Sequence, residues 1–222
     1  MKKDFECNTP VWLLTNQRSG STFLCSLLNS TKQFNTRFVE HFHEHQIQLG
    51  VYKNTLPCTA KILKTHFKNV TGVINKAKIK EIYPNIKFVL LRRKDLVAHT
   101  ISQYFHKVLR ISFIKKNQTK KFKKYENTTE VPFNKNVLID IYKETLKFWN
   151  NWDSFLKGED YISIVYENFV KDPYLTVKRI FGYLEMELPA NWEPEDHVVK
   201  LENPLKEKFK RRLEKIIKKE NI

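Results

Sequence analysis

The chain has 222 residues, 41% of them hydrophobic, and its 40 Lys and Arg residues outnumber its 24 Asp and Glu residues to give a formal net charge of +16. This length and apolar content predict one soluble domain over residues 1–222 with a large buried core. The charge indicates an anionic partner such as nucleic acid, an acidic membrane surface or a phosphorylated small molecule. No apolar run is long enough for a membrane span or signal sequence, and three cysteines without metal-ligand spacing indicate neither a zinc site nor a disulfide framework. We therefore expect a cytoplasmic protein.

Short apolar or β-branched runs alternate along the chain with segments of helical spacing. The strands are expected at Val11–Thr15, Lys61–Lys64, Ile86–Arg92 and Tyr161–Tyr166. The helices are expected at Thr22–Ser30, Val70–Ile82, Leu96–Leu109, Val137–Leu156, Tyr174–Glu185 and Leu205–Lys219, the last one rich in lysine. Residues 114–132 hold six lysines and are expected to form a basic, mobile surface loop. This alternation predicts an α/β fold with a mainly parallel sheet flanked by helices.

The first motif follows the first predicted strand, where residues 17–22 form a tight turn into a helix. Backbone N–H groups, hydroxyls and a helix N-terminus meet there, which is typical of an anion-binding site. Gly20 would let the backbone approach the anion, Ser21 and Thr22 would add hydroxyl donors, and Arg18 would add charge. A nucleotide-triphosphate loop would need glycine at position 15 and lysine at position 21, and the sequence has neither. The alternative is an ordinary helix capped by a serine or threonine.

The second motif follows the strand at residues 86–92. Arg93 would lie at the carboxyl edge of the sheet, where ligands of such folds bind, and Ser102 on the next helix would add a hydroxyl. Alternation along the strand points Arg92 the other way. The alternative is a solvated charge run from Arg92 to Lys94 that pairs with Asp95. With the first motif, the pattern indicates two anion sites, one at each strand end.

The segment "QRSGSTFL" resembles the 5′-phosphosulfate loop, and "RRKDLVAHTIS" the 3′-phosphate motif, of sulfotransferases that use 3′-phosphoadenosine 5′-phosphosulfate (PAPS). The chain is most similar to bacterial carbohydrate sulfotransferases of the trehalose-sulfotransferase type, over residues 10–185. The stretch Tyr166 to Leu184 and the nine-residue spacing of Arg93 and Ser102 also fit this branch. The resemblance implies a P-loop-like sulfotransferase fold, no metal, and a PAPS site formed by Gln17, Arg18, Ser19, Gly20, Ser21, Thr22, Phe23, Arg93 and Ser102.

The resemblance leaves two catalytic assignments open. Glu40, in "RFVEHFHEH", matches the acidic position of the carbohydrate branch, and His66, in "KILKTHF", resembles the basic histidine of cytosolic sulfotransferases. Branch likeness favours Glu40 as the base. For the leaving oxygen we expect Lys61 or Lys64, together with Arg18. The C-terminal tail lacks the Arg-Lys-Gly loop of cytosolic sulfotransferases, and which of its basic residues completes the 3′-phosphate site stays open.

The predicted function is transfer of the sulfuryl group from PAPS to a hydroxyl of a carbohydrate or glycolipid. One alternative is a P-loop-type small-molecule kinase, disfavoured by the missing lysine and magnesium ligands. The other is a basic nucleic-acid-binding protein that uses the lysine run at 115–124, where only Phe122 and Tyr125 supply aromatic rings. We expect no nucleic-acid partner, although a peripheral contact with an acidic membrane surface is compatible with the charge.

Overall fold

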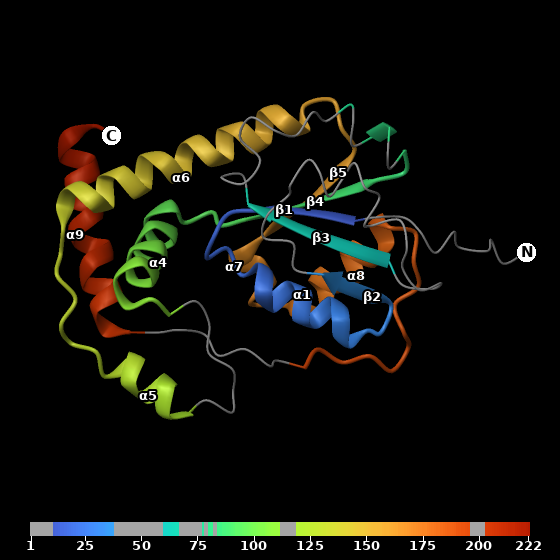
Figure 1. Cartoon of the computed structure of the whole chain (residues 1–222), viewed down its shortest axis with the longest axis horizontal. Coiled ribbons are helices and arrows are strands. Elements are labelled where there is room, and N and C mark those ends of the chain that lie inside the picture. The colour runs from blue at the N-terminus through green and yellow to red at the C-terminus, as the bar shows by residue number, and fades with distance from the viewer. Residues whose placement is uncertain are drawn as a thin grey trace, which may run out of the picture.

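A computed structural model describes residues 11–37, 60–66, 77, 80–81, 84–111, 119–195 and 203–222; for residues 35–37, 60–66, 119, 121, 122 and 124 it describes the backbone. Within these ranges a five-stranded parallel sheet has the order β2-β3-β1-β4-β5 (Figure 1). The strands are β1 (Val11–Thr15), β2 (Phe34–Arg37), β3 (Ala60–His66), β4 (Lys87–Arg92) and β5 (Tyr161–Val165). The predicted α/β class with a parallel sheet is confirmed.

Helices lie on both faces of the sheet and at one end of the molecule. They are α1 (Ser21–Ser30), α4 (Leu96–Leu109), α5 (Thr119–Glu126), α6 (Lys135–Leu156), α7 (Tyr166–Phe169), α8 (Pro173–Tyr183) and α9 (Pro204–Glu220). Most boundaries agree with the sequence within two residues, and α4 agrees at both ends. The expected helix at 70–82 falls mostly outside the described residues. The sequence did not indicate β2 or the single turn of α7.

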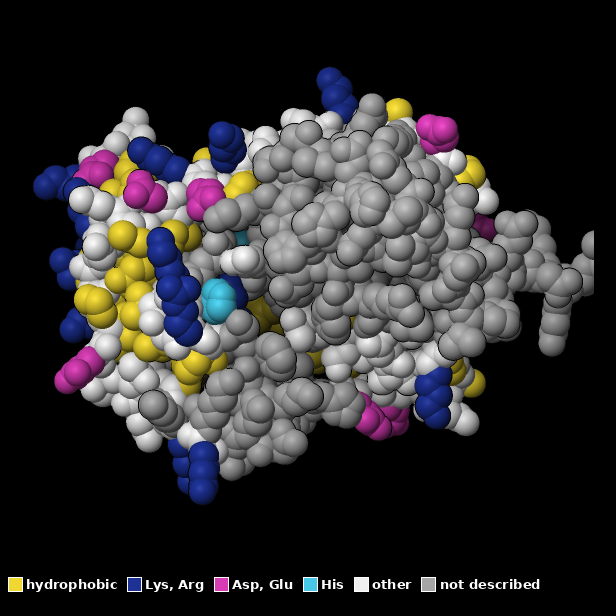
Figure 2. Space-filling model, in the orientation of Figure 1, with side chains coloured by type: hydrophobic (Ala, Val, Ile, Leu, Met, Phe, Trp, Pro, Cys, Tyr) yellow, Lys and Arg dark blue, Asp and Glu magenta, His cyan; other side chains and the backbone are white. Residues whose placement is uncertain are grey.

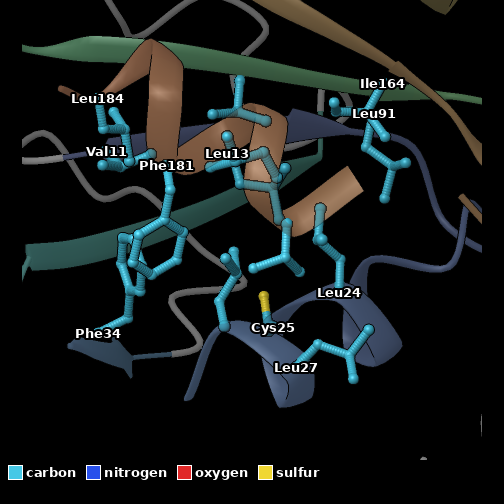
Figure 3. Packing of buried hydrophobic residues seen from close by; sticks show 14 of the residues in the cluster. Val11, Leu13, Leu24, Cys25, Leu27, Phe34, Leu91, Ile164, Phe181 and Leu184 are labelled. Carbon is cyan, nitrogen blue, oxygen red and sulfur yellow. The ribbon is translucent and has the colours of Figure 1, made fainter. Parts of the chain in front are cut away.

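Strands β1 and β4 are buried on both faces, as expected for a parallel sheet between helices. On one face Val11 and Leu13 pack against α1 and α8, with Leu24 and Phe181 in the same cluster (Figure 3). On the other face the ring of Trp12 lies against Phe155 of α6, with ring centroids 5.7 Å apart. Residue parity along a strand therefore decides which layer a side chain meets.

A second apolar cluster joins α4, α5, α6 and α9 beside the sheet, at the left of Figure 1. Part of it comes from the expected loop at 114–132, so that prediction was wrong in part. Residues 119–126 form α5, whose Tyr125 is only 2% exposed, and Val131 is also buried. The lysines of α5 obscured its apolar side in the sequence.

The expected C-terminal helix is present as α9, which packs Phe209 and Leu213 into this second cluster. Lys and Arg side chains gather along the edge of the molecule where α9 lies (Figure 2). Within the described residues, no helix is both long and apolar enough to cross a membrane.

The order of the strands positions the site. From the central strand β1 the chain goes to β2 and β3 on one side, and then crosses to β4 and β5 on the other. Ligands of open parallel sheets bind beyond the carboxyl ends of the strands at such a change of direction. Here the segments that leave β1 and β4 meet at this place.

Candidate active site

The turn after β1 has two residues in the left-handed backbone region. Arg18 has φ 64°, and Gly20 has φ 88° and is the N-cap of α1. No side chain caps α1, so the alternative of an ordinary Ser or Thr cap is not what the structure has. A Cβ on Gly20 would lie 2.5 Å from Cδ2 of Tyr166. Glycine is thus required by the backbone angle and by the Tyr166 ring, and the uncapped N–H groups of α1 remain available.

Two arginines that follow different strands meet at this turn. The Nη1 group of Arg93 donates to the carbonyl oxygen of Arg18 at 3.5 Å, and Nε of Arg18 donates to Oγ of Ser102 at 3.4 Å. Arg18 therefore reaches across to the helix that follows β4. The structure brings three of the sequence-predicted residues together, and the two anion sites inferred from the sequence adjoin one another.

The site concentrates positive charge in a partly buried place. Burial lowers the pKa of Arg18, and the neighbouring Arg93 lowers it further, although Tyr125 and Tyr166 act in the opposite direction. Within the described part of the chain, the buried Oγ of Ser19 has no hydrogen-bond partner. Buried polar atoms are normally satisfied, so this hydroxyl fits a site for a polar, anionic ligand.

The first turn of α7 supports Arg93. The centroid of the Tyr166 ring lies 4.4 Å from the guanidinium carbon of Arg93, and a carboxylate oxygen of Glu167 lies 3.9 Å from Nε of Arg93. Glu167 also accepts hydrogen bonds from the backbone N–H groups of Lys94 and Asp95, at 2.9 and 3.2 Å. The sequence matched this region to the sulfotransferases but assigned no role to either residue. Their position directly after β5 was the signal that could have identified them.

Arg92 points to the opposite layer, as alternation predicted. It forms an ion pair with Asp153, and its guanidinium carbon lies 5.6 Å from the centroid of the Trp149 ring. Both partners belong to α6. The alternative of one solvated run from Arg92 to Lys94 is therefore wrong for the two arginines, which have separate partners.

Asp95 connects this site to the C-terminal helix. Its Oδ1 caps α4 by accepting from the N–H of Ala98 at 2.8 Å, and its Oδ2 accepts from Nζ of Lys210 at 2.6 Å. Burial alone would raise the pKa of Asp95, but the Ala98 hydrogen bond and Lys210 lower it overall. Lys210 was among the tail residues that the sequence could not tell apart.

Several predicted site residues lie elsewhere or cannot be placed. Phe23 packs on Phe169, with ring centroids 4.8 Å apart, and so belongs to the apolar cluster under the sheet rather than to the anion site. Ser21 is buried at the start of α1, with Thr22 next to it. The backbone carbonyl of Gln17 is hydrogen-bonded to the His99 ring. Glu40 lies outside the described residues.

The register of β3 separates the two lysines proposed for the leaving oxygen. His66 pairs with Thr15 and Lys64 with Leu13, near the carboxyl end of β1. Lys61 pairs with Asn35 at the other end of the strand. At about 3.3 Å per residue it lies roughly 16 Å from His66, which disfavours it for the reaction.

Among the described residues, no three His, Cys, Asp or Glu side chains are placed to hold a metal ion together. The histidines at 41, 43 and 45 lie outside these residues.

Comparison with known proteins agrees with this geometry. Residues 68–190, more than half of the chain, match a family model described as the Sulfotransferase family. No match was found among curated protein sequences.

Solved structures with a similar fold include several sulfotransferases. One from Alicyclobacillus acidocaldarius has 15% identity and a TM-score of 0.52, covering 94% of this chain and 95% of that one. Mouse sulfotransferase SULT7A1 complexed with PAP has 10% identity and a TM-score of 0.52, covering 92% of this chain and 63% of that one. Sulfotransferase STF9 from Mycobacterium avium has 10% identity and a TM-score of 0.51, covering 95% of this chain and 68% of that one. From the fold of these neighbours and the match of the family model, we conclude that this chain belongs to the sulfotransferase family and is a sulfotransferase enzyme.

Proposed function

We propose that the enzyme transfers the sulfuryl group of PAPS to a hydroxyl of a carbohydrate or glycolipid. The observation that carries the donor assignment is the contact between Arg18 and Arg93, which follow two parallel strands. Ser19, next to Arg18 in sequence, has a buried hydroxyl without a hydrogen-bond partner among the described residues. Charge-assisted hydrogen bonds from arginine are strong and suit phosphate and sulfate groups. The PAP bound to the mouse neighbour supports the same donor class. The carbohydrate acceptor rests on the sequence resemblance alone.

In this proposal the turn at 17–22 and Arg18 bind the 5′ end of the donor, and Arg93 with Ser102 binds its 3′-phosphate. The acceptor hydroxyl attacks sulfur in line, its proton passes to a base, and the S–O bond to the 5′-phosphate breaks. Arg18 and Lys64 stabilise the charge that develops on the leaving oxygen. No metal takes part.

Binding of PAP, the desulfated donor, tests the assignment. We expect R18A and R93A each to weaken PAP affinity about 10- to 150-fold in calorimetry, the equivalent of a lost charged hydrogen bond. R92A is the matched control, because Arg92 pairs with Asp153 on the other layer and should bind PAP nearly as the parent does. If wild type binds ATP or DNA better than PAP, the proposed donor is wrong.

We propose Glu40 as the base and keep His66 as its rival, since β3 ends at His66 beside the end of β1. E40Q should lower the sulfation rate about 10²- to 10⁴-fold with PAP affinity nearly unchanged, because a general base contributes that much to the rate. H66A should cost far less. The reverse ranking would assign the proton to His66.

A further inference from the structure

His99 is a buried histidine that the reaction proposed above does not use. It lies in the first turns of α4, between Asp95 and Ser102, and is 0% exposed. Its Nε2 lies 2.7 Å from the carbonyl oxygen of Gln17, in the turn after β1. A carbonyl can only accept, so Nε2 carries the proton and donates it. His99 therefore joins the helix after β4 to the turn after β1.

Side chains from other elements donate this hydrogen bond and two more to carbonyls at the end of β1 and in the turn that follows. Nε1 of Trp152 donates to the carbonyl oxygen of Thr15 at 3.3 Å, and Arg93 donates to that of Arg18 at 3.5 Å. The contact from His99 to Gln17 is the shortest of the three. The turn is thus held by side chains of α6, α4 and the segment after β4.

Holding a carbonyl also orients the next N–H group. The peptide unit is planar and trans, so the C=O of Gln17 and the N–H of Arg18 point in opposite directions. With its carbonyl on His99, this peptide turns the N–H of Arg18 away from α4. Successive N–H groups in such a turn, with Arg18 at φ 64°, form the concave arrangement that binds anions.

The surroundings keep the ring neutral. Burial lowers the pKa of His99 to about 3, and the charges of Arg93 and Arg18 act in the same direction, although the Gln17 hydrogen bond opposes them. The ring also lies beside Trp149, with centroids 5.8 Å apart. A neutral donor fits here because it holds the carbonyl without adding a third cation to the site.

We propose that His99 is a positioning residue of the donor site, which holds the Gln17 carbonyl and thereby orients the N–H groups that bind the sulfated end of the donor. This role rests on the proposed function. If His99 has this role, the affinity for PAP depends on a hydrogen-bonding N–H group at the position of Nε2. A well-packed side chain at position 99 without that group is not enough.

Two amide variants separate these cases. In H99Q the side-chain NH₂ can take the place of Nε2, whereas in H99N the shorter amide takes the place of Nδ1 and cannot reach the carbonyl. Both replace the imidazole with one neutral amide, so the variants share the same polar group and differ in how far its NH₂ reaches. By calorimetry, H99Q should bind PAP within about threefold of wild type and H99N about tenfold more weakly, the equivalent of one hydrogen bond. Thermal denaturation of both variants shows whether affinity merely follows stability.

Hydrogen exchange in the free protein supplies a readout that needs no nucleotide. Amides of residues 16–22 should exchange faster in H99N than in wild type, and H99Q should restore their protection. If H99N binds PAP and exchanges like wild type, or if affinity follows melting temperature in both variants, the positioning role is wrong. If wild type fails to bind PAP while exchange still separates H99N from H99Q, the proposed donor fails and the contact from His99 to the turn is upheld.

Discussion

Gly20 shows how one residue serves the backbone and the packing of the site together. Its φ of 88° is one that side-chain-bearing residues avoid, and Tyr166 occupies the space of a Cβ. Gly158, at φ 79°, has the same backbone demand but no atom within 4 Å of a Cβ. The two glycines therefore separate backbone strain from steric overlap.

We expect G158A to lower the free energy of unfolding by about 1 kcal/mol, the cost of a left-handed alanine. G20A should lower it by about 2–5 kcal/mol, because overlap with the Tyr166 ring adds to that cost. Urea denaturation of the two variants measures both values. Equal losses would mean that the ring moves aside freely, and that Gly20 is required only for its backbone angle.

The buried, neutral state of His99 also has a consequence for stability. Its pKa falls from 6.5 to about 3 on folding, mainly because of burial. Below pH 6.5 the unfolded chain binds a proton that the folded chain does not, so this contribution to stability is present above pH 6.5 and is lost as the pH falls toward 3.

Wild type should therefore lose about 2 kcal/mol of unfolding free energy between pH 7 and pH 5 through His99, at about 1.4 kcal/mol per pH unit. H99Q lacks the loss of unfolding free energy that comes from His99, while the acidic groups and the other histidines titrate in both proteins. Urea denaturation at the two pH values gives the difference between them. The same pH dependence in H99Q would show that His99 is protonated in the folded protein.

At the scale of elements, Asn203 connects α9 to the end of α5 by hydrogen bonds. Its Oδ1 caps α9 by accepting from the N–H of Leu205, and its Nδ2 donates to the carbonyls of Tyr125, Glu126 and Thr128 at 2.9, 3.3 and 3.0 Å. Asn203 is only 6% exposed, so water does not easily replace these bonds.

N203S keeps an oxygen for the cap but loses the donors to α5. It should cost about 1–3 kcal/mol of unfolding free energy, and N203A about 1 kcal/mol more, because the cap is lost as well. Chemical denaturation ranks the variants, and hydrogen exchange should show α5 opening first. If N203S matches wild type, α5 is held by its apolar contacts and not by Asn203.

The sequence predicted best where local periodicity decides the structure. Alternation along β4 correctly separated Arg92 from Arg93, and the apolar spacing of α4 predicted both of its ends. It failed for α5, because the lysines outweighed the few apolar residues that the second cluster buries. Contacts between distant segments were also out of reach. Nothing local relates Gly20 to Tyr166 or His99 to Gln17, since the sheet topology brings them together.

At the scale of the whole molecule, the proposed donor site lies between elements of two apolar clusters. The turn after β1 continues into α1, which belongs to the cluster under the sheet, whereas α4 belongs to the cluster with α5, α6 and α9. Polar contacts across the boundary include His99 to Gln17 and Arg18 to Ser102, and Lys210 extends them to α9 through Asp95. A ligand held by both Arg18 and Arg93 would stabilise this boundary.

PAP at 100 times its dissociation constant should add about 2.7 kcal/mol to the free energy of unfolding, provided that it binds only the folded chain. If the boundary couples the clusters, hydrogen exchange should slow in α9 as well as in residues 16–22 and 92–102, because α9 contacts Asp95 through Lys210 and packs Phe209 against Phe105 of α4. K210M is the control: PAP should still protect the two turns, but protection of α9 should fall, because Asp95 loses its contact with that helix. Protection confined to the turns in wild type would mean that the helical cluster opens independently of the donor site, and that α9 contributes to the fold without sensing the ligand.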